Sequence, residues 1–114
     1  MTTIKTISGE LSCTEHIINR SFAIAGIEHI AASDLMSEVL VAEEENMLVI
    51  TALNTEQTIR TAHIVDALGV LLVNGKKPQP GMIRLAEEFD LALLSTKESM
   101  FESCAAVHSL LKRS

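Results

Sequence analysis

The sequence predicts a three-layer α/β/α domain with a mainly parallel sheet, and three runs of consecutive apolar residues carry this prediction. They lie at residues 47–50, 70–73 and 91–94. None of them alternates with polar residues, which is typical of strands buried on both faces. A segment with helical periodicity follows each run, so strands and helices alternate along the chain. Such alternation favours parallel strands joined by right-handed crossovers.

Length and composition agree with one folded domain over residues 1–114. A chain of 114 residues has the usual size of a single domain, and no segment has the composition of a linker. Apolar residues make up 47% of the chain, which argues against intrinsic disorder. Aromatic residues make up only 3%, so the core must be aliphatic.

The first third of the chain has a weaker pattern. Residues 3–12 predict one or two short edge strands, and residues 22–27 predict another strand. Ser33 is a candidate N-cap for a helix over residues 34–42, and residues 43–45 are glutamates that predict a solvated turn. The inward side chains of this helix would be Leu35, Met36, Val39 and Leu40.

Three further helices are predicted at residues 56–68, 81–89 and 97–112. Gly69 would end the first, Pro80 occupies the first turn of the second, and Ser95 with Glu98 forms a capping-box pattern for the third. The apolar stripes are Thr61, Ile64, Val65 and Leu68; then Met82, Leu85, Ala86 and Phe89; then Met100, Cys104, Val107 and Leu111.

Charge and hydropathy restrict the class of partner. The formal net charge is −6, which disfavours nucleic acid or an anionic membrane as the main partner. No apolar run reaches the roughly 20 residues of a transmembrane helix, and the N-terminus lacks a signal-peptide pattern. We therefore expect a cytoplasmic protein that binds neither nucleic acid nor membrane.

Short polar residues follow each predicted strand. Because the carboxyl ends of parallel strands share one edge of a sheet, these residues would meet where helix N-termini also offer free N–H groups. They predict a site for a small anionic or nucleotide ligand. Ordinary capping and turn formation is the alternative for the same residue types. The candidates are Ser33, Thr51, Asn54, Thr55, Asn74, Gly75, Ser95 and Thr96.

No catalytic or metal-binding constellation is evident in the sequence. Cys13 and Cys104 are the only cysteines, too few for a structural zinc site or an iron–sulfur cluster within one chain, and we expect two free thiols. The four histidines lack the spacing of a helical metal pair, and the Walker A pattern is absent. An enzyme would need a Ser, Thr or Cys beside a perturbed partner at the strand ends, and the sequence does not place such a partner.

With these segments in order, the chain resembles the DRTGG domain family over residues 18–111. The matching features are Asn19-Arg20 leading into residues 22–26, then residues 32–40, 47–51, 70–75, 80–88 and 91–96. The glycine-rich turn of the family looks like Asn74-Gly75, where Thr-Gly-Gly is Asn-Gly-Lys. The Asp-Arg pair of the family is replaced near Asn54-Thr55.

The resemblance implies a three-layer α/β/α fold similar to the N-terminal domain of HPr kinase/phosphorylase and to domains beside CBS modules in some pyrophosphatases. In those settings the domain accompanies catalytic or sensing domains and helps to form oligomer contacts. The expected function is a non-catalytic regulatory or adaptor module that forms a homodimer and binds a small anion or nucleotide. Similar stand-alone chains are associated with iron–hydrogenase systems. The alternative is thus an accessory protein of such a redox complex, without a cluster of its own.

Overall fold

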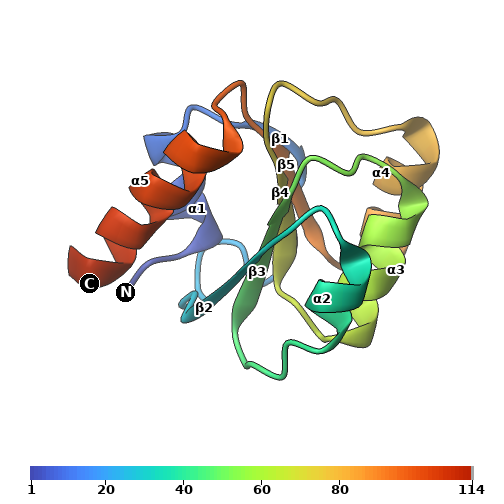
Figure 1. Cartoon of the computed structure of the whole chain (residues 1–114), viewed down its shortest axis with the longest axis horizontal. Helices are drawn as coiled ribbons and strands as arrows, with labels where there is room; N and C mark the ends of the chain where they lie inside the picture. The colour runs from blue at the N-terminus through green and yellow to red at the C-terminus, as the bar shows by residue number, and fades with distance from the viewer. Residues whose placement is uncertain (114) are drawn as a thin grey trace.

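The computed structural model describes residues 1–113 and confirms the predicted fold class, a five-stranded sheet between two layers of helices (Figure 1). Strands β2 to β5 are parallel, and β1 pairs antiparallel with β5 at one edge. In spatial order the strands are β1 (Thr14–Ile17), β5 (Ala92–Ser95), β4 (Gly69–Leu72), β3 (Met47–Thr51) and β2 (His29–Ala32).

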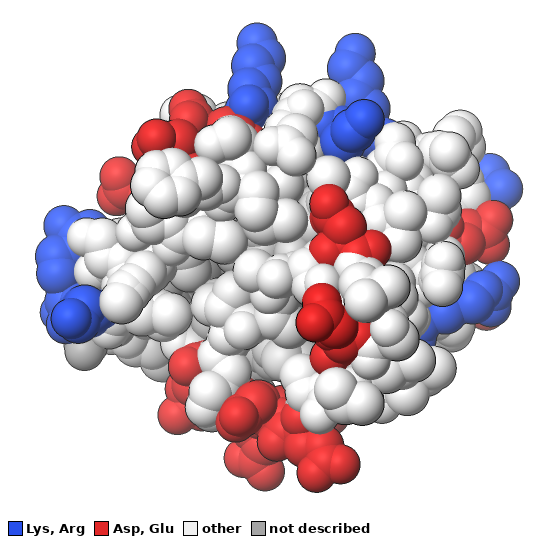
Figure 2. Space-filling model, in the orientation of Figure 1, with Lys and Arg blue, Asp and Glu red and all other residues white. Residues whose placement is uncertain are grey.

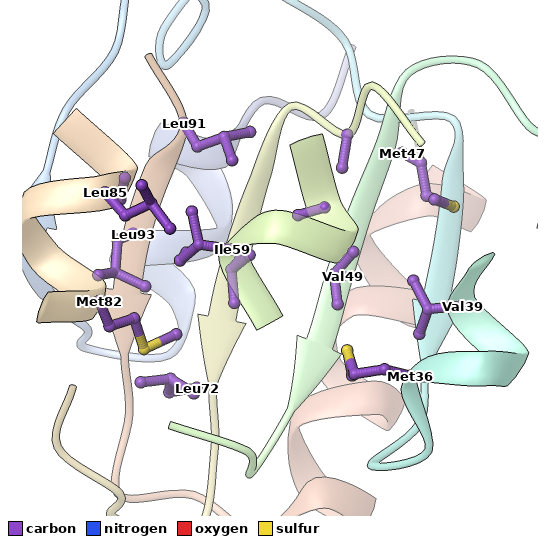
Figure 3. Close-up of a cluster of buried hydrophobic side chains, with 14 residues drawn as sticks. Met36, Val39, Met47, Val49, Ile59, Leu72, Met82, Leu85, Leu91 and Leu93 are labelled. Carbon is purple, nitrogen blue, oxygen red and sulfur yellow. The ribbon is translucent and has the colours of Figure 1, made fainter. Parts of the chain in front are cut away.

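The helices divide into two layers around this sheet. On one face, side chains from α2, α3 and α4 converge on the strands (Figure 3). On the other face, α1 and α5 enclose a second apolar cluster. The helices are α1 (Ile4–Glu10), α2 (Met36–Leu40), α3 (Glu56–Ile64), α4 (Pro80–Glu88) and α5 (Met100–Arg113).

The three central strands lie within one residue of their predicted positions. They are buried on both faces, because alternate residues of each strand belong to opposite apolar clusters. Val49 of β3 and Leu72 of β4 face α3, for example, whereas Leu71 faces the layer of α1 and α5. The predicted stripe of α4 is also confirmed: Met82, Leu85 and Ala86 are buried, and Phe89 is partly buried against them.

The predicted stripe of α3 is wrong at Ile64, whereas Thr61 is buried and Val65 and Leu68 are partly buried. Its buried apolar residues are Ile59 and Ala62, whereas Ile64 is 70% exposed. The helix ends before Asp66, which adopts a left-handed backbone conformation with φ of 58°. Gly69 belongs to β4 instead, where an added Cβ would lie 2.9 Å from the Cβ of Ala92. This glycine is needed for close packing of two strands and does not terminate the helix.

The strands predicted in the first third are also wrong. Residues 3–12 contain α1, whose N-cap Thr3 accepts a hydrogen bond from the Thr6 N–H at 3.2 Å. Residues 22–24 belong to a turn, residues 25–27 form no regular element, and the edge strand β2 begins later, at His29. Phe22 and Ile27 nevertheless reach the core. Their burial explains the apolar pattern that looked like a strand.

Two helix starts differ from prediction. Helix α2 begins at Met36, after Leu35, and Leu35 and Leu40 are exposed whereas Met36 and Val39 are buried. Helix α5 begins at Met100, and its predicted stripe is buried most fully at Val107. Its cap is not the Ser95–Glu98 pair: the hydroxyl of Ser99 accepts the Glu102 N–H at 3.1 Å. The same Ser-x-x-Glu pattern therefore acts four residues further along the chain.

Candidate functional site

The carboxyl ends of β3, β4 and β5 lie at one edge of the sheet, as predicted, but the polar residues there separate into two groups. Gly75, Ser95 and Thr96 line a pocket of about 570 Å³ beside β1. The other candidates lie outside that pocket, and most of their polar side chains make hydrogen bonds within the protein. The structure thus brings together three of the proposed site residues.

The polar residues near β2 form hydrogen bonds that hold the loop between β2 and α2. The carboxylate of Asp34 accepts the hydroxyl of Thr51 at 2.8 Å and the N–H of Ala52 at 2.7 Å. The hydroxyl of Ser33 donates to Glu38 at 2.8 Å and accepts the N–H of Leu35 at 3.0 Å. Thr51 is buried. Thr51 and Ser33 thus hold the segment between β2 and α2 against the end of β3.

Two asparagines hold the loop that follows β4. The side-chain amide of Asn54 donates to the carbonyl of Lys77 at 2.6 Å. The side-chain oxygen of Asn74 accepts the N–H of Met100 at 3.0 Å, and Asn74 itself adopts a left-handed conformation with φ of 62°. Thr55 precedes α3 at the N-cap position without a side-chain cap bond. Both asparagines therefore position the loop that carries Lys76 and Lys77.

The floor of the pocket is built from internal bonds of Thr96 and Gly75. The buried Thr96 hydroxyl donates to the carbonyl of Leu11 at 3.0 Å and accepts the N–H of Glu98 at 3.3 Å. The Gly75 N–H donates to the carbonyl of Thr96 at 3.0 Å. These contacts bring the loops after β4 and β5 together, so Thr96 and Gly75 shape the pocket more than they offer free groups.

Three lysines, Lys76, Lys77 and Lys97, stand around this pocket. Among the described residues that line it, Glu98 is the only carboxylate. Figure 2 shows blue side chains projecting at the top, above the loops that follow β4 and β5, and red side chains at the bottom, where the chain enters β3. The molecule is acidic overall, yet this end of the sheet has a basic pocket.

A histidine that the sequence did not single out completes the pocket. Nε2 of His16 lies 2.8 Å from the hydroxyl oxygen of Ser95, and burial lowers the pKa of His16 below its ordinary value. Within residues 1–113, Nδ1 of His16 has no recorded hydrogen-bond partner. The two residues are 79 positions apart, and β1 was not predicted, so no spacing signal linked them.

Both cysteines are free thiols. Burial raises the pKa of Cys13 to about 11, with a smaller contribution from the charge of Glu15. Burial also raises the pKa of Cys104. Both thiols therefore stay protonated at neutral pH, which makes them weak nucleophiles.

Within residues 1–113, no group of three or more His, Cys, Asp or Glu side chains has the geometry to hold a metal ion. No helix in that range is both long enough and apolar enough to cross a membrane.

No protein-family model matches this chain, and no curated protein matches it. Among solved structures, it is similar to the CBS and DRTGG domains of the regulatory region of Clostridium perfringens pyrophosphatase, complexed with the activator diadenosine tetraphosphate. The TM-score is 0.76 at 14% sequence identity, over 93% of this chain and 46% of the other. The chain thus spans about half the length of that structure. The likeness concerns the fold, and it supports a DRTGG-like fold for this chain.

Proposed function

We propose that this protein is a non-catalytic regulatory module that binds a small phosphate-bearing ligand, such as a nucleotide, in the pocket beside β1. The observation that carries the proposal is the placement of Lys76, Lys77 and Lys97 around one pocket of a chain with net charge −6. The pocket volume of about 570 Å³ lies within the usual range for small-molecule sites.

The chemistry of the lining fits an anion with hydroxyl or base groups attached. Ammonium groups attract phosphate oxygens as point charges, and they do so more strongly in a recess than on an open surface. Ser12, Thr14 and Ser95 add neutral hydroxyls between the lysines. Acidic residues elsewhere on the surface would repel the same ligand, which concentrates it at this end of the sheet. The regulatory region of similar fold is complexed with a nucleotide activator, which agrees with this ligand class.

Thermal denaturation with a set of ligands tests this proposal. AMP, ATP and diadenosine tetraphosphate would be compared with adenosine, which lacks phosphate. A ligand present at 100 times its dissociation constant should stabilise the fold by about 2.7 kcal/mol. The proposal would be falsified if every phosphate-bearing compound left the melting temperature unchanged.

A matched pair of variants locates the site. The double variant Lys76→Gln/Lys97→Gln removes two charges from the pocket and should abolish the ligand-induced shift. Lys5→Gln/Arg84→Gln removes the same charge from exposed positions on α1 and α4 and should preserve it. Equal loss in both variants would mean that net charge, and not the pocket, attracts the ligand.

The Ser95–His16 pair favours a second candidate, a small hydrolase acting on a ligand in the same pocket. The 2.8 Å contact gives the hydroxyl a neighbouring base, and the lowered pKa keeps His16 neutral at physiological pH. No residue in the described chain orients Nδ1, which is why binding is preferred. Chromatography of nucleotides and of p-nitrophenyl acetate after incubation decides between them: product that forms with wild type and not with Ser95→Ala supports hydrolysis.

We further propose that the module forms a homodimer and acts on a partner enzyme or redox complex. An accessory role in an iron–hydrogenase system rests on the family resemblance. Cys13 precedes β1, whereas Cys104 lies on α5. Anaerobic incubation with iron and sulfide, followed by absorbance, tests for a cluster shared between chains. A colourless protein would rule out an iron–sulfur cluster shared between chains.

A further inference from the structure

Within residues 1–113, strand β2 leaves one backbone edge of the sheet unpaired, because its only neighbour there is β3. The N–H groups of His29 and Ser33 point toward β3, where they meet the carbonyls of Asn46 and Ile50. Backbone direction alternates along a strand, so the N–H and C=O groups of Ile30 and Ala32 point outward. The edge carries no proline and no lysine, two residue types that usually protect such edges from pairing.

Both faces of β2 are incompletely covered. A groove of about 490 Å³ separates it from α5 on one face, with Ile30, Ala32, Cys104 and Leu111 in its lining. A second hollow of about 410 Å³ lies between β2 and α2 on the other face, beside Val41. Hollows on both sides of an open edge are what a sheet shows where the next strand is missing.

Helix α5 presents an apolar stripe beside this groove. Cys104, His108 and Leu111 line the groove, and Phe101 lies one helical turn before Cys104 on the same side. Phe101 is 76% exposed, which is unusual for a large apolar side chain. We refer to the β2 edge together with the Phe101–Leu111 stripe as the open-edge surface.

We infer that the open-edge surface takes a second copy of this chain, through antiparallel pairing of the two β2 strands. The inference rests on the homodimer proposed above and states which surface forms its interface. A two-fold axis through Ala31 would pair Ile30 of each copy with Ala32 of the other, so the outward groups of both residues find partners. The Ala31 residues of the two copies would lie opposite each other at the closest spacing of an antiparallel pair, where a small side chain fits.

Charge complementarity on α5 selects a second copy over an unrelated partner. The same two-fold axis leaves both copies of α5 on one face of the joined sheet, running in opposite directions. The first turn of α5 carries Glu102, and its last turn carries Lys112 and Arg113. Antiparallel placement therefore sets the acidic start of each helix toward the basic end of the other. An isologous interface requires such self-complementarity.

Sedimentation velocity of the full chain over a concentration series tests the inference, with wild type expected to be a dimer. Ile30→Pro removes an outward N–H without taking a hydrogen bond from β3, and Phe101→Glu adds a charge to the stripe. Each should raise the dimer dissociation constant by about tenfold or more. Ile64→Glu is the control, because Ile64 is similarly exposed but lies on α3.

The possible outcomes separate the surface from self-association itself. A wild-type monomer at high concentration would overturn both proposals. A wild-type dimer that persists in Phe101→Glu and Ile30→Pro, or that dissociates in Ile64→Glu, would overturn the open-edge surface alone. Circular dichroism of each variant confirms that the fold is retained, and Phe101→Glu provides the answer if Ile30→Pro does not fold.

Discussion

The two edge strands of the sheet, β1 and β2, have different surroundings. At one edge, β1 pairs antiparallel with β5, and its residue His16 contacts Ser95 in the pocket beside β1. At the other edge, β2 ends the sheet with outward backbone groups and hollows on both faces. The β1 edge bears a pocket that can hold a small ligand, whereas the β2 edge is hollowed on both faces and can accept another strand. The proposed ligand site and the proposed self-association surface therefore lie on opposite sides of the sheet.

The largest effect should come from α1, the helix that packs near β1. Ile7 of α1 is fully buried against the sheet, so Ile7→Ala should cost about 2–5 kcal/mol of unfolding free energy. Leu40 of α2, near the open edge, is 44% exposed, and Leu40→Ala should cost about 0.5 kcal/mol or less. Urea denaturation measures both, and similar losses would contradict the contrast between the sides.

The next effect concerns the fastening beside the open edge. Asp34→Ala removes two hydrogen bonds and leaves the buried hydroxyl of Thr51 without its acceptor. We expect a loss of about 1–3 kcal/mol in urea denaturation. Glu87→Ala is the control, since Glu87 is exposed on α4 and should change little. A loss no larger than that of the control would show that this loop does not depend on Asp34.

A smaller effect tests the charges across the open-edge surface. Lys112→Glu should weaken the dimer by about twofold to fivefold, because exposed ion pairs contribute little each. Adding Glu102→Lys to the same chain restores opposite charges at positions 102 and 112 of the two copies and should restore the affinity. Sedimentation velocity of the single and double variants provides the comparison. Failure of the double variant to recover would argue against antiparallel α5 helices.

The smallest effect is a pH dependence at the β1 edge. Burial lowers the pKa of His16 from its usual 6.5, so folding favours the neutral ring. The stability from this group is present above about pH 6.5 and is lost as pH falls through the lowered pKa. His16→Gln should therefore flatten the decline of the urea midpoint between neutral and mildly acidic pH. An unchanged decline would place its cause elsewhere.

The same contrast explains what the sequence could predict. The central strands are buried on both faces, so their apolar runs are continuous and identify them without further information. The edge strands β1 and β2 are half exposed and only four residues long, and their patterns could not compete with the apolar residues of α1 and the turns after it. Burial of a helix or a turn leaves the same local signal as burial of a strand.

The candidate site was predictable to the extent that it follows the central strands. Ser95 ends β5, Thr96 follows it, and Gly75 lies in the loop after β4, so parallel pairing of β4 and β5 brings the three together. His16 enters from an antiparallel strand whose pairing with β5 has no local signature in the chain. Which of the polar residues at the strand ends line the pocket depended on which of them form hydrogen bonds within the protein, as Thr51 does with Asp34. Those bonds are set by tertiary structure.

The loop after β4 has a mechanical consequence through its two asparagines. Asn54 ties it to the segment that begins α3, and Asn74 ties it to the start of α5, so it joins the two helical layers around the end of the sheet. A ligand that moved this loop would pull on both layers together, including the helix that borders β2. Thermodynamic linkage then requires reciprocity: whatever factor the ligand imposes on dimer affinity, dimerisation imposes on ligand affinity.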